Sequence, residues 1–143
     1  MPSILVLEDD EDRTTTMKKV LTERFDRFKL VFFDNAPETI AWLKENPKEA
    51  AIICLDHDLG PNRQVGDAVF DPGTGRDVVN YLATQTPLCP VIIHTTNDWA
   101  APGMEMALTD AGWKCSRVIP SVDLEWIQAA WVRKLKGLIH TES

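Results

Sequence analysis

Five short apolar runs alternate with amphipathic segments along the chain, and this alternation restricts the fold more than any other feature. The runs are typical of buried strands and occupy residues 3–7, 29–33, 50–56, 90–95 and 116–120. The segments between and after them carry apolar residues at helical spacing and occupy residues 8–25, 35–47, 75–84, 103–112 and 122–139. This alternation predicts an α/β fold with one doubly wound, five-stranded parallel sheet and helices on both faces. We expect the strand order 2-1-3-4-5.

The length of 143 residues predicts one domain, covering residues 1–143. A net charge of −7 argues against non-specific binding of nucleic acid, although a metal ion can bridge a small phosphorylated ligand to an acidic protein. The chain has no apolar run long enough to span a membrane, and its N-terminus turns acidic too early for a signal peptide. Cys54, Cys89 and Cys115 are scattered and odd in number, which predicts reduced thiols and a cytoplasmic location.

Polar side chains follow three of the predicted strands at the point where each strand ends. In the expected order the first, third and fourth strands are neighbours, so these side chains converge on one crevice at the carboxyl edge of the sheet. They are Glu8, Asp9 and Asp10 after the first strand, Asp56, His57 and Asp58 after the third, and His94, Thr95, Thr96 and Asn97 at the end of the fourth.

Crowded carboxylates repel one another, and a divalent cation offsets that repulsion. Oxygen ligands alone favour Mg²⁺ or Mn²⁺, whereas ligation by His57 or His94 would also suit Mn²⁺, Zn²⁺ or another transition ion. Simpler roles are open as well, since Asp10 fits a helix cap and His94 fits a hydrogen-bonded structural residue. If the third strand continued through Asp58, Asp56 and Asp58 would share one face and His57 would point to the other.

These motifs resemble the receiver domain of two-component response regulators. In "ILVLEDD" the resemblance places Glu8 and Asp9 as Mg²⁺ ligands, in "IICLDHDLGP" it places Asp56 at the phosphoacceptor position, and in "PVIIHTTN" it places Thr95 at the switch hydroxyl. The resemblance spans essentially the whole chain. It implies the flavodoxin-like three-layer sandwich of receivers.

The departures from the receiver pattern point to a specialised branch. Ile119 precedes Pro120 where a receiver has the lysine that neutralises the aspartyl phosphate. "LDHDLG" together with "HTTN" is similar to the cyclic-phosphate-processing receiver-like domains, which implies an enzyme acting on nucleotide-derived cyclic phosphates. The matching positions are Glu8, Asp9, Asp56, His57, Asp58, His94, Thr95 and Asn97.

The first functional hypothesis is therefore a metal-dependent phosphoesterase acting on a small nucleotide-derived phosphate. Glu8, Asp9 and Asp56 would hold Mg²⁺ or Mn²⁺, which stabilises charge on a phosphoryl oxygen. His57 or His94 would supply general acid–base catalysis through its imidazole. Asp58 would either ligate the metal or orient a histidine. Thr95 and Asn97 would donate hydrogen bonds to phosphate oxygens.

Two alternatives are open. The chain can be a non-catalytic signalling receiver with Asp56 at the phosphoacceptor position, docking a protein partner or a second copy through the last helix. Trp126 and Trp131 lie on that helix, and we favour their packing on the sheet. A haloacid-dehalogenase-like phosphatase would use Asp56 as nucleophile and Asp58 as acid–base, but that motif belongs after the first strand of that family and no suitable catalytic lysine follows.

Two further features flank the expected site. Residues 61–74 form an insertion that is either a lid, with Arg63 or Arg76 meeting phosphate, or a plain surface loop. Trp99 can stack on a base, but we favour its burial against the fourth helix.

Overall fold

The structure is a computed structural model that describes residues 1–142, with side chains described as far as Ile139. Its five-stranded sheet has the order β2-β1-β3-β6-β7, and every neighbouring pair is parallel. The strands are β1 (Ser3–Leu7), β2 (Lys29–Phe33), β3 (Ala50–Leu55), β6 (Val91–Ile93) and β7 (Cys115–Arg117). Counted along the chain this order is 2-1-3-4-5, so the predicted doubly wound α/β sheet is confirmed.

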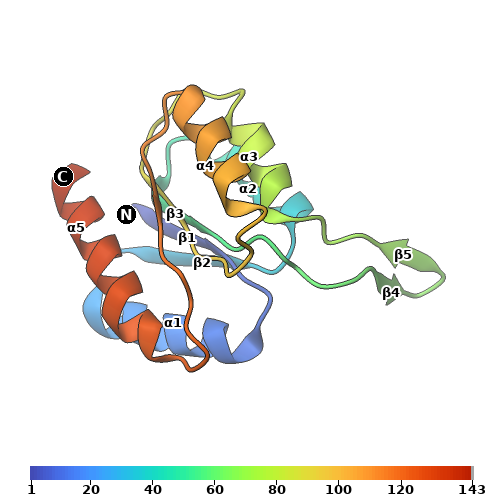
Figure 1. Ribbon diagram of the computed structural model, residues 1–143, viewed down its shortest axis with the longest axis horizontal. Helices are drawn as coiled ribbons and strands as arrows, with labels where there is room; N and C mark the ends of the chain where they lie inside the picture. The colour runs from blue at the N-terminus through green and yellow to red at the C-terminus, as the bar shows by residue number, and fades with distance from the viewer. Residues whose placement is uncertain (143) are drawn as a thin grey trace.

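Helices cover both faces of the sheet, as the alternation predicted. Figure 1 shows α1 and α5 together on one face, and α2, α3 and α4 on the other. The helices are α1 (Glu11–Arg24), α2 (Ala36–Glu45), α3 (Gly75–Leu82), α4 (Ala101–Asp110) and α5 (Val132–Glu142), the last preceded by a π-helical turn η1 (Ile127–Trp131).

The pleat of the strands divides the core into two layers. Ile4 and Val6 of β1 pack with α1 and with Trp131, whereas Leu5 and Leu7 pack with the helices of the opposite face. All four β1 side chains are completely buried, because successive residues of a strand point to opposite sides and both sides are covered. This firm support on both faces fixes where β1 and its neighbours end, and those ends carry the site.

Side-chain caps begin three helices at the carboxyl edge of the sheet. Asp10 accepts a hydrogen bond from the Arg13 amide at 2.9 Å, and Asn35 accepts one from the Glu38 amide at 2.8 Å. At α3, Asp77 accepts a hydrogen bond from the amide of Thr74 at 3.0 Å. The capping role considered for Asp10 is therefore confirmed.

The insertion and the last helix differ from expectation. The insertion contains a two-stranded antiparallel hairpin, β4 (Arg63–Val65) and β5 (Ala68–Phe70), which projects away from the body in Figure 1. Residues 122–124, expected to be helical, precede the last helix. None of the helices in the described part of the chain is both long and apolar enough to cross a membrane.

The expected burial of the tryptophans is confirmed for Trp126 and Trp131 and wrong for Trp99. Trp126 and Trp131 are buried against the sheet, as favoured. Trp99 was expected to pack on the fourth helix, but its side chain is 96% exposed. The physical reason is its position, since Trp99 lies in the turn before α4 begins at Ala101 and its amide is bonded to the Asn97 side chain at 3.1 Å.

Candidate functional site at the carboxyl edge of the sheet

Glu8, Asp9 and Asp56 form a group of carboxylates at the ends of two neighbouring strands. Leu7 of β1 pairs with Leu55 of β3, which brings the residues that follow them together. One carboxylate oxygen from each of the three acids lies within 4.8 Å of the other two. Glu8 and Asp56 are buried while Asp9 is exposed, so the group opens to solvent on the Asp9 side.

The carboxylate of Glu8 is fixed by contacts with backbone amides, His94 and Arg13. Its Oε2 accepts hydrogen bonds from the amides of Asp9 and Asp10, each at 3.0 Å. Its Oε1 lies 3.2 Å from His94 Nε2 and 3.5 Å from Arg13 Nη1. Burial alone would raise the pKa of Glu8, but the contact with His94, followed by the backbone amide and Arg13, outweighs burial and lowers that pKa to about 2. Glu8 is therefore an anion.

Asp56 has the opposite electrostatic setting. Its Oδ1 accepts a hydrogen bond from the His57 amide at 2.7 Å, and its Oδ2 lies 4.0 Å from Arg13 Nη1. Burial, followed by the charge of Glu8, raises the pKa of Asp56 to about 8, and the same two causes raise the pKa of Asp9. A divalent cation among these oxygens would relieve the repulsion, and an all-oxygen donor set fits Mg²⁺ or Mn²⁺.

His57, Asp58 and Asn97 form a second cluster beside the carboxylates. His57 Nδ1 lies 3.0 Å from Asp58 Oδ1, and Asn97 Nδ2 donates to Asp58 Oδ2 at 3.3 Å. Asp56 and Asp58 do not share a face, because β3 ends at Leu55 and the strand alternation stops there. Since His57 directly follows Asp56, this His–Asp pair adjoins the carboxylate group.

Gly75 makes room for the turn that carries Asp56 and His57. Its amide donates to the carbonyl oxygen of His57 at 2.9 Å. A Cβ atom at this position would collide with the carbonyl oxygen of Asp56. The start of α3 therefore passes directly against the backbone of the site, which only glycine permits.

His94 occupies a different environment from His57. Its ring has no exposed surface and lies between Trp126, at a centroid distance of 6.0 Å, and Trp131, at 6.3 Å. The 3.2 Å approach of Nε2 to Glu8 lacks hydrogen-bond geometry, and Nδ1 has no hydrogen-bond partner among the described residues. His94 thus reaches the carboxylate group only from behind, through Glu8.

Thr95 and Asn97 organise the end of β6. The buried Thr95 Oγ1 accepts a hydrogen bond from the Asn97 amide at 3.0 Å. Asn97 Oδ1 in turn accepts from the amides of Trp99 and Ala100, which leaves Asn97 Nδ2 directed at Asp58. Arg117 supports this turn by donating to the Thr95 carbonyl oxygen at 2.9 Å.

Arg13 is a site residue that the sequence reasoning missed. Its guanidinium lies close to both Glu8 and Asp56 and stacks 5.4 Å from the ring centroid of Trp126. Ile119 supplies no charge and its side chain is 61% exposed. The available signal was the place of Arg13 in the first turn of the helix after the acidic pair, which aims a long side chain back at the strand ends.

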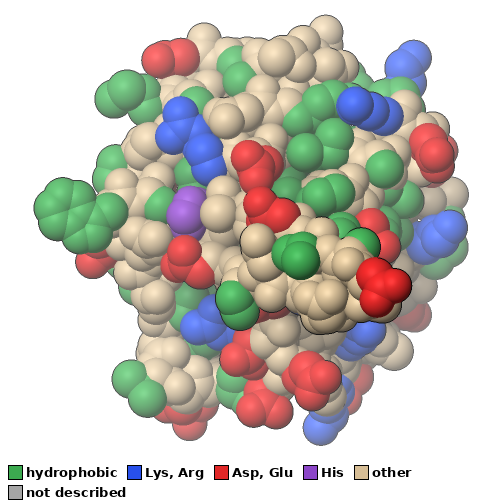
Figure 2. Space-filling view, turned by 90° about the vertical axis from the view of Figure 1, so that its right-hand side faces the viewer, with side chains coloured by type: hydrophobic (Ala, Val, Ile, Leu, Met, Phe, Trp, Pro, Cys, Tyr) green, Lys and Arg blue, Asp and Glu red, His purple; other side chains and the backbone are tan. Residues whose placement is uncertain are grey.

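A cavity of about 480 Å³ adjoins the carboxylate group on the side of β2. It lies between α1, the end of β2 and the start of α2, and Glu8 and Asp9 form part of its wall. Figure 2 shows this edge of the molecule, with acidic side chains gathered around the base of the projecting hairpin.

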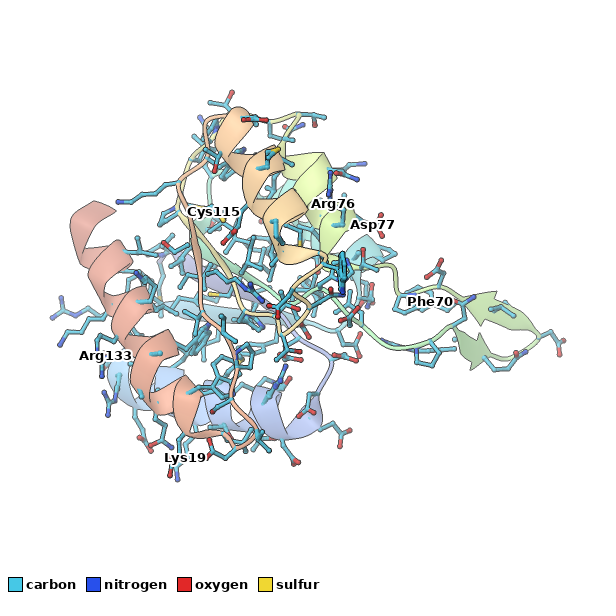
Figure 3. The ribbon with its side chains drawn as sticks, viewed as in Figure 1. Lys19, Phe70, Arg76, Asp77, Cys115 and Arg133 are labelled. Carbon is cyan, nitrogen blue, oxygen red and sulfur yellow. The ribbon has the colours of Figure 1, made fainter. Side chains whose placement is uncertain are left out.

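The two arginines considered as phosphate ligands are already bound to protein groups. Arg63 donates to Asp34 Oδ1 at 3.2 Å and to the Asp34 carbonyl oxygen at 3.0 Å, and its guanidinium lies 5.7 Å from the centroid of Phe70. Arg76 donates to Asn80 Oδ1 at 2.9 Å. Figure 3 shows Phe70 on the hairpin and Arg76 on α3, so the two arginines belong to separate parts of the surface.

Comparisons with known proteins agree with the fold. A family model described as the cyclic-phosphate processing receiver domain matches residues 4–110, a range that contains all eight predicted site residues. No curated protein matches the chain. At the identities given below, the solved structures show the fold alone.

Three solved structures are similar. The phosphorylated cyanobacterial phytochrome response regulator RcpA has 17% identity and a TM-score of 0.72, covering 99% of this chain and 96% of that one. The Mn²⁺-bound form of the response regulator Rcp1 has 19% identity and a TM-score of 0.70, with coverages of 96% and 95%. A response regulator receiver domain from Rhodospirillum rubrum has 19% identity and a TM-score of 0.67, with coverages of 99% and 94%.

Proposed function

Because the chain belongs to the cyclic-phosphate processing receiver domain family, we propose that it is a metal-dependent phosphoesterase acting on cyclic phosphates derived from nucleotides. The observation that carries this proposal is that two clusters meet at consecutive residues, where the His57 amide donates to Asp56 Oδ1. Asp56 belongs to the group of three carboxylates, and the next residue, His57, forms a pair with Asp58. A site for a cation and a site for proton transfer are thus adjacent in the chain.

Glu8, Asp9 and Asp56 are the residues that would hold Mg²⁺ or Mn²⁺. A bound cation polarises a phosphoryl oxygen and stabilises the charge that develops on it. Glu8 is anchored from behind by two amides, His94 and Arg13, while Asp9 provides the exposed side of the group. The Mn²⁺-bound form of Rcp1, which shares this fold, supports a divalent cation here.

His57 is the general acid–base group in this proposal. Asp58 accepts the Nδ1 proton, so Nε2 is the nitrogen that exchanges protons with the reaction. His57 takes a proton from water as the water oxygen forms a new P–O bond. One P–O bond of the cyclic phosphate breaks, and the departing oxygen receives that proton to give a hydroxyl group and a phosphate monoester.

Asn97, Thr95 and His94 have supporting roles in the same proposal. Asn97 Nδ2 lies beside Asp58 and is the donor that we assign to a phosphate oxygen. The Thr95 hydroxyl holds the Asn97 amide, so it fixes the position of that donor. His94 positions Glu8 and takes no part in proton transfer, because its ring has no exposed surface.

The test is direct. Purified protein is incubated with nucleoside 2′,3′-cyclic monophosphates and Mg²⁺ or Mn²⁺, and the products are followed by ³¹P NMR. We expect a monoester product, no product for Asp56→Asn, and a rate lower by roughly 10²–10⁴ for His57→Gln. Absence of conversion by the wild-type protein with either metal would overturn the phosphoesterase proposal.

A second candidate is a signalling receiver phosphorylated on Asp56. The observation in its favour is Arg13, whose Nη1 lies 4.0 Å from Asp56 Oδ2 and brings a cation to a site where Ile119 brings none. Incubation with acetyl phosphate and Mg²⁺, followed by intact mass measurement, tests it. Addition of one phosphoryl group, lost in Asp56→Asn, would favour this candidate, and no addition would exclude it.

The haloacid-dehalogenase-like alternative has no comparable support. In the sheet, Asp56 follows β3 rather than β1, and β3 lies beside β1 in the interior of the strand order. Asp58 turns to His57 and Asn97 instead of sharing a pocket with Asp56. The nucleophile and acid–base pair required by that reaction is therefore not assembled.

A further inference from the structure

We propose that the cavity between α1 and the end of β2 binds the nucleoside part of the substrate and selects a cyclic mononucleotide that carries no other phosphate group. This inference rests on the phosphoesterase function proposed above and specifies the substrate class of the same site. Apart from Glu8 and Asp9, it concerns side chains that none of the roles assigned so far uses.

The position of the cavity fits this role. The cavity shares Glu8 and Asp9 with the carboxylate group, so a ligand whose phosphate lies at these acids can extend directly into it. Its volume of about 480 Å³ is typical of sites for small organic molecules. His57 follows β3, whereas the cavity lies over β1 and β2, so a nucleoside there leaves the access of His57 to the phosphate open.

Aromatic residues line the cavity at the end of β2. Phe32 and Phe33 are only partly buried and belong to opposite layers of the core, Phe32 on the α1 side and Phe33 on the α2 side. The Lys18 ammonium lies 5.2 Å from the centroid of Phe32, so Phe32 is the ring on the side of α1. Aromatic side chains next to a phosphate site stack on nucleobases, whatever the base. A small polyol cyclic phosphate has no planar group that would stack on the Phe32 ring.

The polar lining favours a neutral, hydrogen-bonding ligand. Thr14 and Thr15 of α1, which both carry hydroxyl groups, line the cavity. Besides Glu8 and Asp9, the lining of the cavity includes one ammonium group, that of Lys18, and three carboxylates. The carboxylates are those of Glu11, Asp34 and Glu38. Carboxylates accept hydrogen bonds from sugar hydroxyls and base amino groups, yet they repel phosphate.

Charge therefore decides between two sources of a 2′,3′-cyclic phosphate. A free cyclic mononucleotide brings only the reacting phosphate, whereas the end of an RNA strand brings a further phosphate on the 5′ side. Arg63 is bound to Asp34, and the whole chain has a net charge of −7, so the surroundings do not compensate the second phosphate. The mononucleotide is the better match.

The experiment compares Thr15→Trp with Thr22→Trp. Both residues are exposed on α1, but only Thr15 lines the cavity, so the second variant controls for an added indole on the same helix. Binding of cytidine 2′,3′-cyclic monophosphate, its 5′-phosphorylated form and glycerol 1,2-cyclic phosphate is measured with Mg²⁺ by NMR titration of the full chain. The backbone amides of residues 14–18 and 32–34 are the reporters, and the melting temperature checks folding.

We expect Thr15→Trp to weaken binding of the cyclic nucleotide about tenfold while leaving glycerol cyclic phosphate unaffected, and Thr22→Trp to match the wild type. The 5′-phosphate should weaken binding about tenfold at low salt and less at high salt. Equal binding by Thr15→Trp and the wild type, or tighter binding of the 5′-phosphorylated form, would overturn the inference. Cavity-specific binding without hydrolysis would uphold it and contradict the phosphoesterase activity.

Discussion

Glu8 and Asp56 show how neighbouring carboxylates come to differ. Glu8 has two backbone amides, His94 and Arg13 as partners, and its pKa falls to about 2. Asp56 has one amide and a more distant Arg13, so burial and the charge of Glu8 dominate and its pKa rises to about 8. The two carboxylates therefore differ before any cation binds, because the surroundings of Glu8 favour its charged form and those of Asp56 favour its protonated form.

The first prediction concerns Asp56→Asn. A raised pKa means that folded, metal-free protein holds a proton that the unfolded chain releases, so its stability falls as pH rises from 3.8 to about 8. Asp56→Asn removes this loss and should stabilise the metal-free protein by about 1–3 kcal/mol at pH 8, while abolishing stabilisation by Mg²⁺. Thermal melts with and without Mg²⁺ test both effects.

The control for this prediction is Asp58→Asn. The Asp58 side chain is 66% exposed and outside the carboxylate group, so both melting temperatures should stay close to those of the wild type. A metal-free Asp56→Asn protein that is less stable than the wild type at pH 8 would show that Asp56 carries no unfavourable charge.

The second prediction separates the two histidines. His94→Phe keeps a ring between the tryptophans but leaves Glu8 without its imidazole partner, which should cost about 1–3 kcal/mol and weaken Mg²⁺ binding. Because the pKa of Glu8 is lowered from 4.5 to about 2, this deficit should be full above pH 4.5 and disappear towards pH 2. Chemical denaturation across this pH range measures it.

His57→Gln is the matched variant for the second prediction. Its partly exposed side chain contacts Asp58 and Asn97 but not Glu8, so stability and Mg²⁺ affinity should be nearly unchanged. A His57→Gln protein that loses Mg²⁺ binding as strongly as His94→Phe would contradict the separate roles assigned to the two residues.

At the scale of elements, the loops that follow the strands create the site, and Gly75 is the tightest point among them. Gly75→Ala should push the start of α3 away from the Asp56 carbonyl oxygen, lowering stability by about 2–4 kcal/mol and weakening Mg²⁺ binding. Gly137→Ala makes the same substitution within α5, where a Cβ meets nothing within 4 Å, and should raise stability by about 0.5–1 kcal/mol. Urea denaturation measures the free energy of unfolding of both variants. An unchanged value for Gly75→Ala would contradict the close approach of Gly75 to the Asp56 carbonyl oxygen.

The fourth prediction concerns the hairpin. Arg63 holds the β4–β5 hairpin to Asp34 through two hydrogen bonds, and Val65 and Val69 are more than half exposed. Arg63→Ala should therefore speed proteolytic cleavage within residues 63–70 while changing global stability by less than about 1 kcal/mol. Limited proteolysis with peptide mapping tests this, and unchanged cleavage would mean that other contacts hold the hairpin.

Sequence patterns predicted the elements well where local chemistry decides them. The first three strands and the cap at Asp10 depend on a few adjacent residues, and they appear where expected to within one residue. The last two strands end earlier than their apolar runs predicted, at Ile93 and Arg117. The hairpin within residues 61–74 has short, exposed strands with little apolar periodicity, so no sequence pattern predicted it. Trp99 was misplaced because helix periodicity does not apply to the turn before a helix.

For the whole molecule, the predicted strand order was the inference that located the site. It brought Glu8, Asp9 and Asp56 together correctly, because parallel strands end at one edge of the sheet. Strand order does not predict the direction of side chains. The sequence therefore did not show that His94 faces Glu8 between two tryptophans while His57 lies at the surface. Nor did it reveal that Arg13 crosses from α1 to both carboxylates.

The central claim is that the carboxylate group holds a divalent cation at the place where the cyclic phosphate binds. The most direct test is anomalous diffraction from a crystal of the protein grown with Mn²⁺. We predict one Mn²⁺ with oxygen atoms of Asp9 and Asp56 at about 2–2.5 Å and Glu8 on its inner side. A fully occupied Mn²⁺ bound elsewhere, with this group left without metal at saturating concentration, would contradict the account.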